Sequence, residues 1–296
     1  MPIISLKQGI AEYLTKIDYV SAGQQNFFPL NTLKNSIIND ANVRVNIVDR
    51  SVFYVQINAS DYYEMIANTF FYNHSRFEEH CKQITYLEHS SSSAWLLTTI
   101  YYACFFAANE ITNLHGIFNL TITNDEKKKL IPKNISEEHD KVRDFLSKGP
   151  NHFYGKASYI PRSKTVQIRF ESGGGKPHEL AWMNLNRILT YDSLGTSRRL
   201  NHMSRLKFIL EKTHKWKRPN QIRNEWNYSR PELYLDEGNI FRDSISQYLN
   251  NFEKLNQWAG RGKIVRKNDE DDIVSILFLF NILKSVIAEQ KQHLLV

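Results

Sequence analysis

The alternation of apolar and polar residues divides this chain into many helical segments and two short β-rich segments. Apolar residues recur at spacings of three and four over most of the chain, a pattern that predicts helices. Strict alternation occurs at residues 43–57 and 157–172, where it predicts two β-hairpins. The predicted helices span about 5–16, 30–40, 60–81, 93–114, 136–147, 178–193, 197–217, 221–229, 231–258 and 270–292.

These elements predict a mainly α protein, with an N-terminal α/β extension over residues 1–85 and a helical domain over 86–296. The second hairpin lies in an insert at about 121–178. The rest of that insert is polar and broken by Pro132 and Pro150, so residues 123–155 predict a loop around one short helix.

The apolar run "SAWLLTTIYYACFFAANEI" at 93–111 is about as long as a membrane span. Serine, threonine and tyrosine residues interrupt it, and an Asn-Glu pair lies near its end. We therefore expect a buried core helix and no membrane association.

Composition favours a globular protein of a reducing compartment. Of the 296 residues, 42% are hydrophobic and 23% are charged, which is enough apolar material for a core. Cys81 and Cys104 lie too far apart to indicate a zinc knuckle or a disulfide framework. Charges interrupt the N-terminal segment early, so we expect no signal peptide and a cytoplasmic location. Neither the histidine spacings nor "GGGK" at 173–176 matches a metal or phosphate-binding motif, and no cofactor is predicted.

The positive charge is concentrated in residues 197–223. This segment has nine lysines and arginines and one acid, Glu211, whereas the whole chain has a net charge of +7. Leu200, Met203, Leu206 and Leu210 form an apolar stripe, and Arg198, Arg205 and Lys212 fall on the opposite helical face. A basic face beside an aromatic residue suits a phosphate backbone, but a solvated helix face is the competing interpretation. The predicted nucleic-acid-binding residues are Arg198, Arg199, Arg205, Lys212, Lys215, Trp216, Lys217 and Arg218.

Two segments resemble the HEPN family. "SAWLLTTIYYACFFAANE" is similar to the second HEPN helix, with its paired tyrosines, aromatic pair and small residues. "IRNEWNYS", about 110 residues later, resembles the family signature of an arginine, a polar residue and a histidine a few residues on. The resemblance covers roughly 86–120 and 180–258. It implies a helical bundle that dimerises, cuts RNA without a metal, and belongs to a bacterial toxin–antitoxin or antiphage system.

The chain departs from this signature at its last position. Tyr228, not histidine, stands five residues after Arg223. In a catalytic interpretation, Arg223 stabilises charge on the phosphate, Asn224 positions the 2′-OH, and Tyr228 is a weak acid or orienting group. His202 or His214 could instead approach from the preceding helix.

Three further interpretations remain open. The site is degenerate and the protein is a scaffold that binds RNA or a partner protein. Alternatively, the protein is a sensor whose insert recognises a phage product or a small ligand. In the third, Arg223 and Asn224 merely begin a helix whose Trp226 and Tyr228 pack in the core.

Overall fold

The chain is mainly helical, and its strands form one antiparallel sheet. The structure is a computed structural model that describes residues 2–19, 31–88, 92–135, 138–189, 197–229, 239–261 and 265–295. It divides into two compact units, and each is described by itself. The helical unit comprises Met1–Gly9, Asn73–Ile111 and Trp182–Gln290, and the sheet unit comprises Ile10–Tyr72, Thr112–Ala181 and Lys291–Val296.

Five strands form the sheet in the described part of the sheet unit. Their order is β1-β2-β5-β4-β3, and each neighbouring pair is antiparallel. The two predicted hairpins are confirmed as β1–β2 and β4–β5, and the pairing of β2 with β5 joins them. Strand β3 was not predicted. The bounds are β1 (Arg44–Ile47), β2 (Val52–Asn58), β3 (Ile117–Thr121), β4 (His152–Ile160) and β5 (Thr165–Ser172), with the 3-10 turn η3 (Pro161–Ser163) between β4 and β5.

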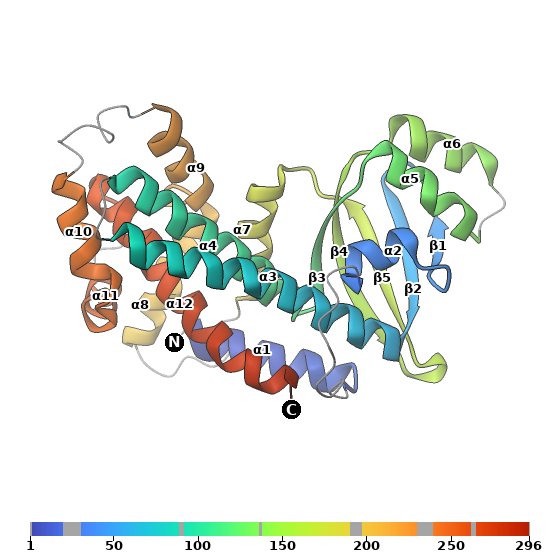
Figure 1. The fold of residues 1–296 in the computed structure, drawn as a ribbon, viewed down its shortest axis with the longest axis horizontal. Coiled ribbons are helices and arrows are strands. Elements are labelled where there is room, and N and C mark those ends of the chain that lie inside the picture. Colours follow the sequence, from blue (N-terminus) through green and yellow to red (C-terminus); the bar gives the residue numbers. More distant parts are fainter. Residues whose placement is uncertain are drawn as a thin grey trace. The chain divides into compact units, whose positions relative to one another are not determined.

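One face of the sheet is apolar and packs against helices. The ring of Phe53 on β2 lies 4.9 Å from that of Phe170 on β5 and 5.5 Å from that of Phe145. Phe145 belongs to α6 (His139–Lys148), which lies near α2 (Leu33–Asn39) and α5 (Asn124–Leu130) at the sheet in Figure 1. Because successive strand residues point to opposite faces, the other face carries the more polar residues of the same strands.

Helix α5 and the 3-10 turn η2 (Ile131–Lys133) correct the prediction of a loop from residue 123. The hydroxyl of Thr123 accepts from the N–H of Glu126 at 3.2 Å, and the Glu126 carboxylate accepts from the N–H of Thr123 at 2.7 Å. This capping box satisfies two backbone donors and starts the helix. The buried Lys127 donates to the carbonyl of Gly149 at 2.7 Å, and burial lowers the pKa of Lys127.

The helical unit is built around α4 (Ser93–Asn113), the predicted core helix. Leu97, Ile100 and Cys104 on α4 are essentially inaccessible to solvent. No helix in the described ranges has the length and apolar character needed to cross a membrane. The other helices with residues in this unit are α1 (Pro2–Lys16), α3 (Ala59–Leu87), α7 (Pro177–Ile188), α8 (Ser197–Glu211), α9 (Pro219–Asn224), the π-helix η4 (Glu225–Ser229), α10 (Asn239–Leu249), α11 (Phe252–Gly260) and α12 (Asp269–Leu295).

Several predicted helix bounds in this unit were wrong. The helix predicted over 197–217 ends at Glu211, and the one predicted over 221–229 begins at Pro219 and becomes a π-helix. In place of one helix over 231–258, the structure has α10 and α11, and residues 230–238 lie outside the described part. The side chain of Asn251 accepts from the N–H of Lys254 at 2.9 Å and so starts a new helix there.

Candidate nucleic-acid interface

Arg223 lies in the last turn of α9, just before the backbone changes from α to π geometry. Pro219 occupies the first helical position, where its missing N–H removes no intrahelical hydrogen bond. The π-helix η4 then follows directly from Glu225. Short π-helical turns occur frequently at functional sites.

The Arg223 side chain packs against the paired tyrosines of α4. Its guanidinium carbon lies 5.3 Å from the ring centre of Tyr101 and 5.6 Å from that of Tyr102, within range of a cation–π interaction. Tyr101 is fully buried, and burial raises its pKa well above its usual value, so its phenol stays neutral. Within the part of the chain that the structure describes, the guanidinium contacts these aromatic rings and no carboxylate.

Arg223 also keeps one donor unused. Its Nε atom is inaccessible to solvent and has no hydrogen-bond partner among the described residues. A buried donor without a partner costs free energy, and charged donors bind phosphate oxygens strongly. Because this Nε atom is inaccessible to solvent, it is available to an anion only after the side chains around it move.

Asn224 and Tyr228 do not join Arg223 in one cluster. Both are exposed, and Tyr228 is 76% accessible, whereas Arg223 is half-buried. Helical geometry turns Asn224 by about 100° away from Arg223, and Tyr228 follows to a similar side. Between them, the amide oxygen of Asn227 accepts from the Thr98 hydroxyl on α4 at 2.7 Å, which fixes η4 against α4.

The two histidines considered from the sequence are engaged elsewhere. His202 is buried, and its Nε2 lies 2.8 Å from the carbonyl oxygen of Asn256. His214 is exposed, and its ring lies 4.2 Å from that of Phe208. The described structure gives neither of them a contact with Arg223.

A different histidine, His80 on α3, reaches the tyrosine cluster. Its ring stacks 5.9 Å from that of Tyr102 and 5.5 Å from that of Phe106. Its Nδ1 atom is buried without a partner among the described residues. Burial lowers the pKa of His80, Glu79 raises it and Arg76 lowers it; the net result is a pKa below 6.5 and a neutral ring at pH 7. Arg223 and His80 therefore share one aromatic neighbour, Tyr102.

Arg205 was predicted to face solvent, and this prediction was wrong. The residue is only 3% exposed. Its guanidinium donates to the carbonyls of Ala259 at 3.2 Å and Arg261 at 2.9 Å, and it stands 4.5 Å from the ring centre of Trp258. These carbonyls lie at the C-terminal end of α11, where helices leave acceptors unsatisfied and cations are stabilised. Of the predicted apolar stripe, Met203, Leu206 and Leu210 are buried as expected, and the side chain of Leu200 lies outside the described residues.

Trp216, also predicted at the surface, is 1% exposed. Its ring lies 5.8 Å from that of Trp258, and the Arg205 guanidinium lies 5.7 Å from it. The Nε of Arg218 donates to the carbonyl of Leu210 at 2.9 Å. A large share of the basic segment therefore holds the loop between α8 and α9 in place.

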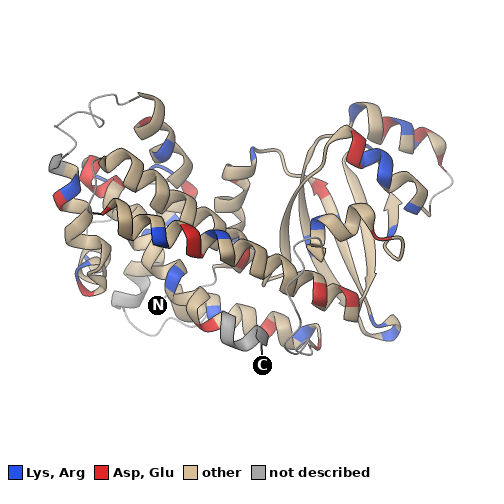
Figure 2. Ribbon diagram, viewed as in Figure 1, with Lys and Arg blue, Asp and Glu red and all other residues tan. Residues whose placement is uncertain are grey.

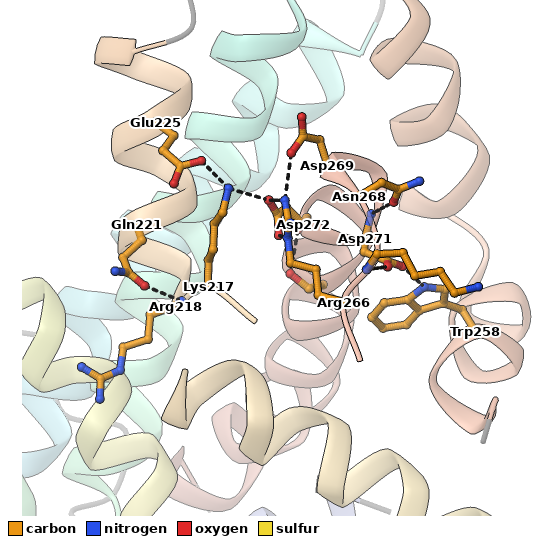
Figure 3. A network of polar contacts seen from close by, with 12 residues as sticks. Lys217, Arg218, Gln221, Glu225, Trp258, Arg266, Asn268, Asp269, Asp271 and Asp272 are labelled. Carbon is orange, nitrogen blue, oxygen red and sulfur yellow. Dashed lines mark hydrogen bonds and ion pairs between the residues drawn. The ribbon is translucent and has the colours of Figure 1, made fainter. Parts of the chain in front are cut away.

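Lys217 is the centre of a network of charged residues shown in Figure 3. Its ammonium group pairs with Glu225 on η4 and, at 3.2 Å, with Asp272 on α12. Burial lowers the pKa of Lys217, but its bonds and charge contacts with the two carboxylates outweigh burial and raise it. The buried Asp272 also accepts two hydrogen bonds from Arg266, at 2.5 and 2.7 Å. The network fastens the Arg223-bearing helix to the N-terminus of α12.

Of the predicted nucleic-acid-binding residues, Lys212 and Lys215 are exposed as expected. Both have left-handed backbones, with φ of 63° and 67°, in the α8–α9 loop. The side chains of Arg198 and Arg199 lie outside the described residues. Figure 2 shows lysines and arginines spread over both units and interspersed with acids, so the described charges do not gather into one stripe.

Tyr101 and Tyr102 were visible in the sequence as a pair within the first of the two segments, at 93–110, which resembles the second HEPN helix. No motif marks His80, because its place beside them depends on how α3 packs on α4. No family model, no curated protein and no solved structure matches the chain.

Proposed function

We propose that this chain is a HEPN-like RNA-engaging protein of a bacterial defence or toxin system, and that its helical unit cuts RNA without a metal ion. The observation that supports this proposal is the Arg223 guanidinium held on Tyr101 and Tyr102, beside the same tyrosine on which His80 stacks.

In the proposed reaction, the 2′-oxygen of the RNA attacks its own phosphorus and the 5′-oxygen of the next nucleotide leaves. Arg223 stabilises the negative charge that develops on the phosphate oxygens. His80 is neutral at pH 7 because burial lowers its pKa, so it accepts the proton of the attacking 2′-OH, the role that the sequence signature lacks, and a water molecule protonates the departing 5′-oxygen. The exposed Asn224 and Tyr228 contact the RNA strand on the outer side of the helix, and dimerisation follows the family habit.

The test is incubation of the full chain with total bacterial RNA in EDTA, followed by mapping of the product ends. The wild type is expected to leave 2′,3′-cyclic phosphate or 3′-phosphate ends. Arg223→Ala is expected to slow cleavage about a hundredfold or more, as for loss of a transition-state charge donor. Arg223→Lys keeps the charge without the planar fork and is expected to recover only part of the rate. Cleavage by Arg223→Ala at the wild-type rate would show that another site is responsible.

A second candidate function is RNA binding without cleavage. It is favoured by the outward position of Asn224 and Tyr228, on a different side of the helix from Arg223. This candidate predicts intact RNA with every variant and an affinity that falls steeply with salt. Changing Lys212 and Lys215 together to alanine would then weaken binding, whereas Arg223→Ala would leave it nearly unchanged.

A further inference from the structure

The sheet unit presents a polar face with aromatic and basic residues on adjacent strands. On this face, Tyr54 of β2 stands opposite Arg169 of β5, and Arg169 stands opposite Lys156 of β4. One step along the sheet, Glu171 of β5 stands opposite Tyr154 of β4. The rings of the two tyrosines therefore flank the central strand of the sheet.

The exposure of these residues shows that the face is open. The side chains of Arg169 and Glu171 are 53% and 44% exposed, Lys156 is exposed, and both tyrosines are half-buried. The packed face of the same strands, in contrast, consists of residues such as Phe53 and Phe170 with no exposure. Helix α6 reaches the sheet through Phe145 on that packed side.

The charge of the open face suits an anionic polymer. Arg44, at the start of β1, lies in register beside Gln56 and adds a third exposed cation to Lys156 and Arg169. Glu171 is the one acid among the cross-strand neighbours of Tyr54 and Tyr154 on this face, and its carboxylate pairs with Arg169 at 3.3 Å. The guanidinium of Arg169 also lies 5.9 Å from the ring centre of Tyr54. Three cations against one paired carboxylate leave a positive surface.

The spacing of the tyrosines suits two separate bases. They are two strands apart and offset by two residues, so strand geometry places their Cα atoms about 12 Å apart. Bases of single-stranded RNA stack on aromatic residues of open sheet faces, two or three bases to a sheet. Duplex RNA cannot use such a surface, because its bases are already stacked on each other.

We propose that this face binds single-stranded RNA, with Tyr54 and Tyr154 each stacking on one base while Arg169, Lys156 and Arg44 contact the phosphates. The proposal extends the proposed function by naming the form of RNA that is bound, and it places that contact in a different unit from Arg223. The two sites are therefore separable by mutation.

The experiment measures binding of the full chain to a fluorescent single-stranded oligouridylate of about eight nucleotides. Replacement of both tyrosines by alanine is expected to weaken binding about tenfold or more, since stacking on each ring contributes substantially. Replacement of both by phenylalanine keeps the rings and is expected to retain the affinity. Changing Arg44 and Lys156 to alanine should lower the slope of log affinity against log salt by about 1.4.

Photocrosslinking with 4-thiouridine gives a second measurement that does not depend on stability. Cross-links are expected on the β2 and β4 peptides.

Each outcome decides one of the two proposals. Wild-type affinity in the double alanine variant, or equal affinity for duplex RNA, would overturn the sheet-face site. Full competition by polyglutamate would also overturn it and would indicate an acidic peptide. Loss of cleavage in Arg223→Ala with the sheet variants unaffected would support the helical site alone. Loss of oligouridylate binding in the sheet variants, without any cleavage by the wild type, would support the sheet face alone.

Discussion

Replacing Arg205 with alanine distinguishes a structural role from a nucleic-acid role for this residue. Its guanidinium donates to the carbonyls of Ala259 and Arg261 and lies over Trp258. A hydrogen bond from a charged donor contributes about 1.5–3 kcal/mol, and a cation–π contact of this kind contributes about 0.5–2 kcal/mol. Because these contributions overlap, we expect the free energy of unfolding to fall by about 3–5 kcal/mol.

The assay is urea unfolding followed by tryptophan fluorescence, which suits this site because Trp216 and Trp258 both lie near the guanidinium. The transition midpoint should move to lower urea while its slope stays the same. Lys212→Ala is the matched control, because Lys212 comes from the same predicted basic face but is exposed; we expect a change below about 0.5 kcal/mol.

One result would refute this reasoning about Arg205. If Arg205→Ala unfolded at the wild-type urea concentration and bound RNA more weakly, with a reduced dependence on salt, the residue would be a phosphate ligand. The basic face predicted from the sequence would then be correct in function, and the contacts with the end of α11 would contribute little.

Three other predictions concern buried charge, pH and backbone packing. Asp272→Asn should destabilise the protein by about 3–5 kcal/mol in thermal unfolding, because Lys217 and Arg266 lose their shared buried carboxylate; an unchanged Tm would contradict this. Because burial lowers the pKa of His80, the stability that its neutral ring contributes should be complete above about pH 6.5 and should fall as the pH drops below that value. His80→Phe should remove this dependence of the urea midpoint on pH. Gly149→Ala should be poorly folded by circular dichroism, because a Cβ atom there would lie 2.3 Å from a backbone carbonyl oxygen. Gly174→Ala tests the opposite case, in which space is open but φ is left-handed at 62°, and only a mild loss of stability is expected.

The elements that were predicted well depend on local patterns. The hairpins at 43–57 and 157–172 follow from strict alternation around turn residues, and α4 follows from its apolar composition. The joining of the two hairpins into one sheet could not be predicted in this way. It rests on the β2–β5 register, in which Tyr54 pairs with Arg169 far along the chain. Strand β3 is only five residues long and follows α4 through a turn that ends at Gly116, so it reads as the end of the long apolar segment.

The candidate site was predicted in part for a similar reason. The pattern at α8 identified the buried face correctly, but it could not show that the opposite face is also covered. A charged residue is buried when backbone acceptors satisfy it, and Arg205 finds these acceptors on α11, fifty residues further along. His80 shows the reverse case, in which a residue without a motif reaches Tyr102 through helix packing.

The β2–β5 pairing also has a consequence for folding during synthesis. The two partners Tyr54 and Arg169 are 115 residues apart, and residues 73–111 between them belong to the other unit. A ribosome that adds about 5–20 residues per second needs about 6–23 s to supply the missing strand after β2 has emerged. During that interval the first hairpin has an unpaired edge and an apolar face without its final cover, which is the condition under which strands associate wrongly. Folding of this chain is therefore expected to depend on the speed of translation and on chaperones that protect the hairpin until β5 arrives.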